Sequence, residues 1–92
     1  MKAIWKYPLK IESKQTLEMP GTGPKLLSVQ MQAGVPCLWA VVEPNSEQKS
    51  VVVIDIVGTG HILEEDDTER YFLGTVQQGG LVWHVFRREL YS

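Results

Sequence analysis

Two threonines and two histidines are among the residues of this chain whose types and positions could hold a polar ligand. Thr59 and His61 follow a long apolar run, Thr75 and His84 come later, and a glycine precedes each threonine. Glycine lets backbone N–H groups approach a ligand closely, and a threonine hydroxyl both donates and accepts hydrogen bonds. The pattern therefore indicates either a small polar pocket or turns and bulges in which glycine supplies a positive φ.

The glycine-threonine pairs match no familiar phosphate-binding loop. A P-loop has the spacing Gly-x4-Gly-Lys-Ser/Thr, and the dinucleotide fingerprint needs a third glycine that opens a helix. Gly58-Thr59-Gly60 has neither spacing, and the residues that follow show no sustained helical period. A ligand contact from Thr59, His61 or Thr75 would therefore belong to a loop of another kind.

A catalytic histidine would need partners that the sequence does not bring together. A general base of this kind works with an orienting carboxylate and a nucleophile. Asp55 could orient a histidine and Thr59 or Ser28 could attack a substrate, but no spacing enforces that arrangement. A hydrogen-bonded histidine within a sheet is the favoured interpretation, so we assign no catalytic residue.

The acidic run Glu64–Asp67 and the single cysteine do not indicate a metal site. An EF-hand loop alternates its ligands around a central glycine and ends in glutamate, and the acidic run lacks that pattern. Cys37 has no second cysteine with which to form a disulfide or a cysteine zinc site within the chain. We therefore expect a solvated acidic loop, no metal and no cofactor.

Amide side chains, an arginine and aromatic rings supply the other candidates for binding. Gln30 and Gln32 share a strand face with Ser28, so that face is either plain surface or the floor of a polar pocket. Paired amides suit a base or a ribose because each amide both donates and accepts hydrogen bonds. An arginine suits a phosphate, and an exposed aromatic ring suits a base. The candidate ligand-binding residues are Gln30, Gln32, Thr59, His61, Thr75 and Arg87.

Alternating apolar and polar residues predict strands along nearly the whole chain. Pro8 favours an edge position for the first strand, and apolar residues on both faces of 37–43 favour a central one. Connections at 33–36 and 77–80 predict hairpins, and 19–24 is interpreted as a turn cluster. We expect an all-β fold, a small antiparallel sandwich or half-open barrel of about six strands. The expected strands are 3–9, 25–32, 37–43, 50–57, 70–76 and 81–88.

Length and composition indicate a single folded domain over residues 1–92. The chain is 43% hydrophobic and 22% charged, and its net charge is −2. Its basic residues are scattered, which argues against a nucleic-acid surface. We find neither a signal-peptide core nor the roughly 20 apolar residues that span a bilayer, so we expect a cytosolic protein. A chain this short buries limited apolar area alone, which favours a homo-oligomer.

The motifs taken together resemble a family of small bacteriophage and prophage proteins that carry a domain of unknown function. The resembling segments run through nearly the whole chain and are Tyr7-Pro8-Leu9, Met19-Pro20, Leu27–Gln32, Leu38–Val42, Gly58–His61, Gly74-Thr75 and Trp83–Phe86. Gly23-Pro24 departs from the Gly-Ala pair expected there, which affects only the turn. The resemblance implies a phage-encoded protein in the cytoplasm of a host bacterium, and it implies no catalytic residues.

The resulting hypothesis is a non-enzymatic, homo-oligomeric phage protein that sequesters a small nucleotide-type immune signal. Phage sponge proteins, which hold nucleotide signals at subunit interfaces, are similar in size and setting, and that likeness is an analogy. An alternative is a module that inhibits a host defence protein through a sheet edge or an aromatic patch. A hydrolase that uses a histidine with Asp55 is a third interpretation.

Overall fold

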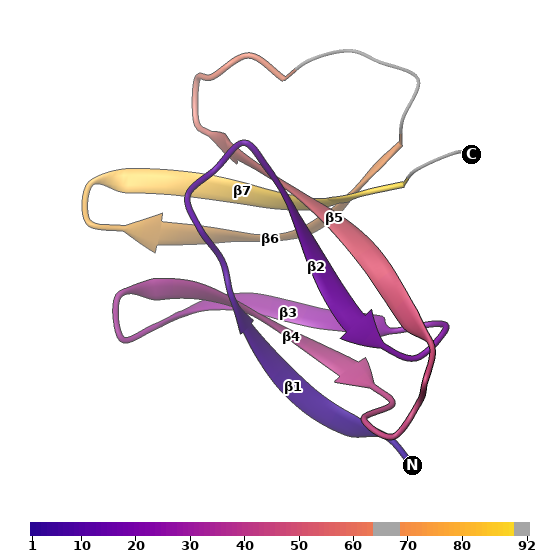
Figure 1. Cartoon of the computed structure of the whole chain (residues 1–92). Coiled ribbons are helices and arrows are strands. Elements are labelled where there is room, and N and C mark those ends of the chain that lie inside the picture. Colours follow the sequence, from indigo (N-terminus) through magenta and orange to yellow (C-terminus); the bar gives the residue numbers. More distant parts are fainter. Residues whose placement is uncertain (64–68, 90–92) are drawn as a thin grey trace.

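The computed structural model describes residues 1–63 and 69–89, which form seven strands and no helix (Figure 1). The strands in chain order are β1 (Ala3–Pro8), β2 (Lys14–Pro20), β3 (Lys25–Gln32), β4 (Val35–Val42), β5 (Lys49–Gly58), β6 (Arg70–Gln78) and β7 (Leu81–Arg88). Many of their side chains are β-branched or aromatic, and such side chains pack well on a pleated surface. The all-β fold expected from the sequence is confirmed.

The strands form two antiparallel sheets that pack as an open sandwich. The three-stranded sheet has the order β1-β4-β3, and the four-stranded sheet has the order β2-β5-β7-β6. β3 and β6 lie side by side where the sheets meet (Figure 1). A Cβ atom added at Gly74 of β6 would lie 3.5 Å from the carbonyl oxygen of Val29 on β3. The sheets thus touch closely along one side and do not close into a barrel.

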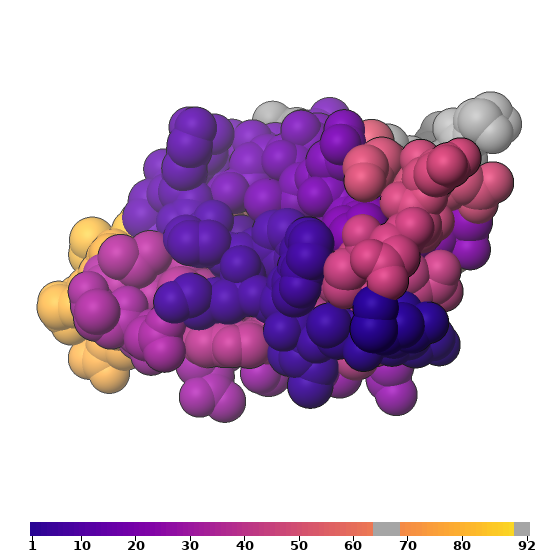
Figure 2. Space-filling model, turned by 60° about the horizontal axis from the view of Figure 1, so that its bottom comes forward, coloured from indigo at the N-terminus to yellow at the C-terminus, as the bar shows by residue number. Residues whose placement is uncertain are grey.

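Two hairpin ends meet at one end of the sandwich. Figures 1 and 2 show the turn between β3 and β4 beside the turn between β6 and β7. Gln78 Nε2 donates a hydrogen bond to the carbonyl oxygen of Gly34 at 3.2 Å, and Trp83 Nε1 donates to Gln78 Oε1 at 3.2 Å. Gln78 therefore links the two sheets through side-chain contacts rather than through a strand ladder.

β2 is the strand that the sequence analysis did not predict. Met19 and Pro20 close this strand, so the turn begins at Gly21, which has a φ of 110°, and not at residue 19. Leu17 and Met19 supply only a short apolar alternation among polar residues, and that signal is weak. Pro20 fits the strand because β2 lies at the edge of its sheet, where a missing N–H group is tolerated.

The hydrophobic core lies between the inner faces of the two sheets. β4 is the central strand of its sheet, as predicted, and β1, which ends at Pro8, is an edge strand. Tyr7 of β1 packs against this core, and burial raises the pKa of its phenol. The central core residues, each at most 5% exposed, are Leu38, Ala40, Val42, Val52, Ile54 and Ile56.

The turn between β3 and β4 places an alanine in a left-handed conformation. Ala33 has a φ of 51° and Gly34 a φ of 79°, and Gln32 pairs directly with Val35. Two consecutive positive φ values characterise the type I′ turn, whose twist matches that of the flanking strands. The Cβ of Ala33 is disfavoured in this region, whereas Gly34 has no Cβ to clash.

Replacing Ala33 with asparagine or glycine is expected to stabilise the protein by about 0.5–1 kcal/mol, because both residues tolerate a positive φ better than alanine. Urea denaturation monitored by tryptophan fluorescence measures the change in the free energy of unfolding. Gly34→Ala, which adds a second Cβ to the turn, is the matched control and should lower the stability. Equal stability of A33N, A33G and the parent chain would contradict this account of the turn.

Candidate functional site

The outer face of the four-stranded sheet, which points away from the core, carries a cluster of charged side chains. Asp55 lies on β5 between the core residues Ile54 and Ile56, so alternation turns it outward. Arg70 of β6 and Arg88 of β7 pair with each other across the ladder. They lie level with Val53, two residues from Asp55 along β5, and therefore face the same side as Asp55. The register of three strands thus brings one carboxylate and two guanidinium groups together.

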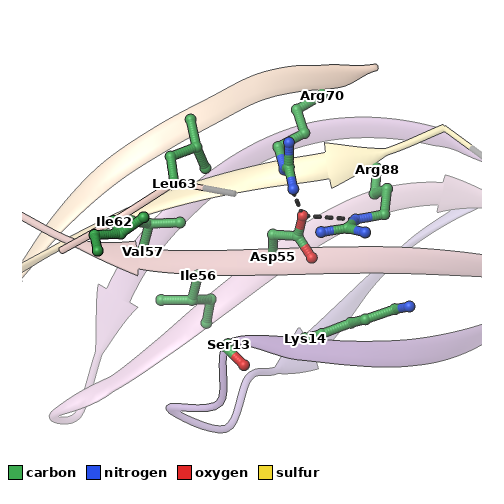
Figure 3. Close-up of a pocket in the computed structure, with 9 residues that line it drawn as sticks. All are labelled: Ser13, Lys14, Asp55, Ile56, Val57, Ile62, Leu63, Arg70 and Arg88. Carbon is green, nitrogen blue, oxygen red and sulfur yellow. Dashed lines mark hydrogen bonds and ion pairs between the residues drawn. The ribbon is translucent and has the colours of Figure 1, made fainter. Parts of the chain in front are cut away.

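Asp55 accepts hydrogen bonds from both arginines through one oxygen atom. Arg70 Nε and Arg88 Nε each donate to Asp55 Oδ2 at 2.8 Å (Figure 3). Asp55 is only 2% exposed although it lies on an outer face. Charge-assisted hydrogen bonds of this length are strong, and a buried carboxylate is tolerated only with such partners. The two contacts therefore tie β6 and β7 to β5.

A pocket of about 290 Å³ lies beside this ion pair (Figure 3). Its polar end is formed by Asp55 with Arg70 and Arg88, together with Ser13 and Lys14 near the start of β2. Its apolar end is formed by Val57, Ile62 and Leu63, which Figure 3 shows grouped on the opposite side from Arg88. Among the described residues the lining thus holds three cationic side chains, those of Lys14, Arg70 and Arg88, and one carboxylate, that of Asp55.

Both predicted threonines bind the same histidine on this outer face. Thr59 Oγ1 lies 2.8 Å from His84 Nε2, and Thr75 Oγ1 lies 3.0 Å from His84 Nδ1. A neutral imidazole donates through one nitrogen and accepts through the other, and either hydroxyl can take the complementary role. His84 pairs with Val57 across the ladder, so this Thr-His-Thr group borders the apolar end of the pocket.

The other predicted ligand-binding residues lie in three places. His61 approaches the ring of Trp83 edge-on, with centroids 6.5 Å apart, in a hollow of about 330 Å³ that Thr59 also lines. Arg87 lines a groove of about 470 Å³ with Lys25 at the junction of the sheets. Gln30 and Gln32 are exposed on the three-stranded sheet, where Lys6 Nζ donates to Gln32 Oε1 at 2.5 Å. The structure therefore groups Thr59, His61 and Thr75 and separates them from Gln30, Gln32 and Arg87.

The arrangement considered for a hydrolase is formed only in part. Thr59 and His84 are within hydrogen-bonding distance, as a nucleophile and its base would be. The second nitrogen of His84 faces Thr75, however, and Asp55 Oδ2 binds the two arginines. Asp55 therefore orients guanidinium groups and not the imidazole.

Two further searches concern the described residues alone. Residues 1–63 and 69–89 contain no group of three or more histidine, cysteine, aspartate or glutamate side chains placed to hold a metal ion. In the same part of the chain no helix has the length and apolar character required to cross a membrane. The acidic run Glu64–Asp67, expected to be a solvated loop, lies outside the described residues.

Comparison with models of known protein families assigns the chain to one family. A family model matches residues 1–91, which is almost the entire sequence. The chain belongs to the DUF7352 family. That family is described as a domain of unknown function, so this part of the resemblance inferred from the motifs is confirmed. No curated protein and no solved structure matches the chain.

Sequence reasoning did not single out the ion-pair residues of this DUF7352 chain. The available signal was Asp55 itself, because a carboxylate inside an apolar strand must find a cationic partner. Arg87 and Arg88 were equivalent by sequence, and alternation turns only one of them outward. In the register Arg88 pairs with Val53, on the same face as Asp55 to which it donates, whereas Arg87 pairs with the core residue Ile54.

Asp55→Asn is expected to destabilise the protein by about 3–5 kcal/mol, because a neutral amide no longer balances the charge of the two guanidinium groups that bind this buried position. Urea denaturation followed by far-UV circular dichroism measures this loss. Glu18→Gln, an exposed carboxylate on β2 of the same sheet, is the matched control and should change the stability by less than about 0.5 kcal/mol. A loss below about 1 kcal/mol for D55N would show that the ion pair does not hold the sheet.

Proposed function

We propose that this protein is a non-enzymatic binding protein that sequesters a small nucleotide-derived molecule, and that it acts as a homo-oligomer. The observation that carries the proposal is that three cationic side chains, those of Lys14, Arg70 and Arg88, line one pocket. Guanidinium and ammonium groups are the usual partners of phosphate oxygens. A buried aspartate that fixes both arginines gives a phosphate a rigid set of donors instead of mobile surface side chains.

The apolar end of the pocket supports a ligand with an organic part. Val57, Ile62 and Leu63 form a wall that an inorganic ion does not need. Ligand pockets combine an apolar surface with placed polar groups, and this pocket offers both, although its polar part is larger than is usual. The Thr-His-Thr group next to Val57 adds hydroxyl groups within reach of a ligand that extends out of the pocket.

The size of the pocket supports the homo-oligomer. Its volume of about 290 Å³ is at the lower end of the range of about 300–1,000 Å³ that is typical of ligand pockets. A cyclic dinucleotide would therefore extend beyond it, and a second copy of the chain would cover the exposed part. The symmetric ligand would then match a two-fold interface.

The proposed setting follows the resemblance to phage and prophage proteins. A phage that expresses such a protein in the host cytoplasm would remove a nucleotide signal on which a bacterial defence depends. The anionic character of those signals suits the three cationic side chains that line the pocket.

The test of this function is recovery of a bound ligand. The purified chain is incubated with cyclic dinucleotides and ADP-ribose-derived signals, washed, and heated to release what it holds. Intact ligand is the expected result, with a homo-oligomer in light scattering. A cleaved product would make the protein an enzyme, and no uptake of any signal would point to a protein target and overturn the proposal.

Lys14→Gln is expected to weaken binding of the recovered ligand by about tenfold, because a charge-assisted contact contributes about 1.5–3 kcal/mol. Lys14 is exposed, so the substitution should leave the fold intact. Isothermal titration calorimetry at low salt measures the affinity. Lys49→Gln, at the exposed start of β5, is the matched control and should bind like the parent chain. An equal effect of the two substitutions would remove Lys14 from the site.

A further inference from the structure

Two phenylalanine rings lie side by side on the outer face, next to the arginines. Phe72 of β6 pairs with Phe86 of β7, and their rings meet edge to face with centroids 5.6 Å apart. Phe72 is 62% exposed, although it lies within a strand and not in a loop. A large apolar side chain so placed leaves most of one ring face available to a partner.

The phenylalanines and the cations alternate along the same two strands. Arg70 precedes Phe72 by two residues, and Arg88 follows Phe86 by two residues, so all four side chains share the outer face. Asp55 pairs with Phe86 in the ladder, which places the aromatic pair directly beside the ion pair. Arg70 reaches Asp55 from two strands away, a span of about 10 Å at the usual strand spacing, so its side chain passes over β7.

A β-bulge keeps Phe72 on this face. The register of β6 against β7 shifts between Phe72 and Gly74, so Phe72 and Thr75 face the same side despite their odd separation. Without the bulge, strand alternation would turn one of these two side chains toward the core. The bulge therefore presents an aromatic ring and a hydroxyl group together on the surface that borders the pocket.

We infer that Phe72 stacks the base of a nucleotide whose phosphate is held by Lys14, Arg70 and Arg88. This inference rests on the function proposed above and adds the part of the ligand that the pocket lining does not specify. An aromatic ring accepts any base through its π face, and cations beside it hold the backbone phosphate. The site then selects a nucleotide over a sugar phosphate or a free phosphate.

Other aromatic residues near the pocket have different surroundings. The phenol of Tyr71 donates to Glu69 Oε2 at 2.8 Å, and Tyr71 faces the opposite side of β6 from Phe72. Trp83 packs against the core, and its indole nitrogen donates to Gln78. Phe72 therefore combines exposure, the correct face and a position beside the cations.

The test compares two probes that differ only by the base, AMP and ribose 5-phosphate, in calorimetric titrations of the full chain. The parent chain should bind AMP at least about tenfold more tightly, because stacking of one base contributes roughly that factor or more. Equal affinity for the two probes would overturn the stacking inference and leave the anion pocket in place. No binding of either probe would count against both the inference and the proposed function.

Substitutions at position 72 distinguish the effect of an aromatic ring on affinity from the effect of apolar volume alone. Phe72→Leu should bring the affinity for AMP down to that for ribose 5-phosphate and leave the affinity for ribose 5-phosphate unchanged. Phe72→Tyr keeps the ring and should retain the preference for AMP. Trp5→Leu, which removes a partly exposed ring from the three-stranded sheet, is the matched control. A preference for AMP that survives in F72L would overturn the assignment of Phe72.

Discussion

The ion pair of Asp55 with Arg70 and Arg88 is the interaction on which the four-stranded sheet depends. It joins β5, β7 and β6 through one carboxylate oxygen of Asp55, a residue that is almost completely buried. Burial of any of these charges without a partner would cost several kcal/mol, so the contacts with Asp55 help to stabilise all three. The registers of the three strands are therefore coupled. A slip of one residue in β6 or β7 would turn an arginine inward and leave Asp55 without that partner.

The same three residues connect the stability of the sheet to the candidate pocket. Side chains that hold a framework together cannot relax freely, so the proposed ligand would meet donors that are already in position, and binding would cost the protein less side-chain entropy. Lys14 differs from them because it is exposed at the start of an edge strand. A substitution of Lys14 should therefore change the affinity for the proposed ligand without changing stability, whereas a substitution of either arginine should change both.

Much of the fold follows from local sequence pattern, whereas the site depends on long-range register. The alternation in β3, β4 and β7 and the glycines of the tight turns suffice to predict strands and hairpins. β2 is not predicted from the sequence because Leu17 and Met19 supply too little apolar alternation. The shared glycine-threonine context of Thr59 and Thr75 indicates a common role, but their meeting at His84 requires the bulge after Phe72. Sequence pattern does not reveal such a bulge, nor which of Arg87 and Arg88 faces Asp55.

β1 and β2, two of the four edge strands in the described part of the chain, carry features that discourage pairing with a further strand. β1 ends at Pro8 and β2 at Pro20, and charged side chains such as Lys6 and Glu18 are exposed along them. Proline and charge on an edge discourage the addition of a further strand, which is the route by which open sheets grow into aggregates. Along these two strands the folded protein is therefore protected against edge-to-edge aggregation.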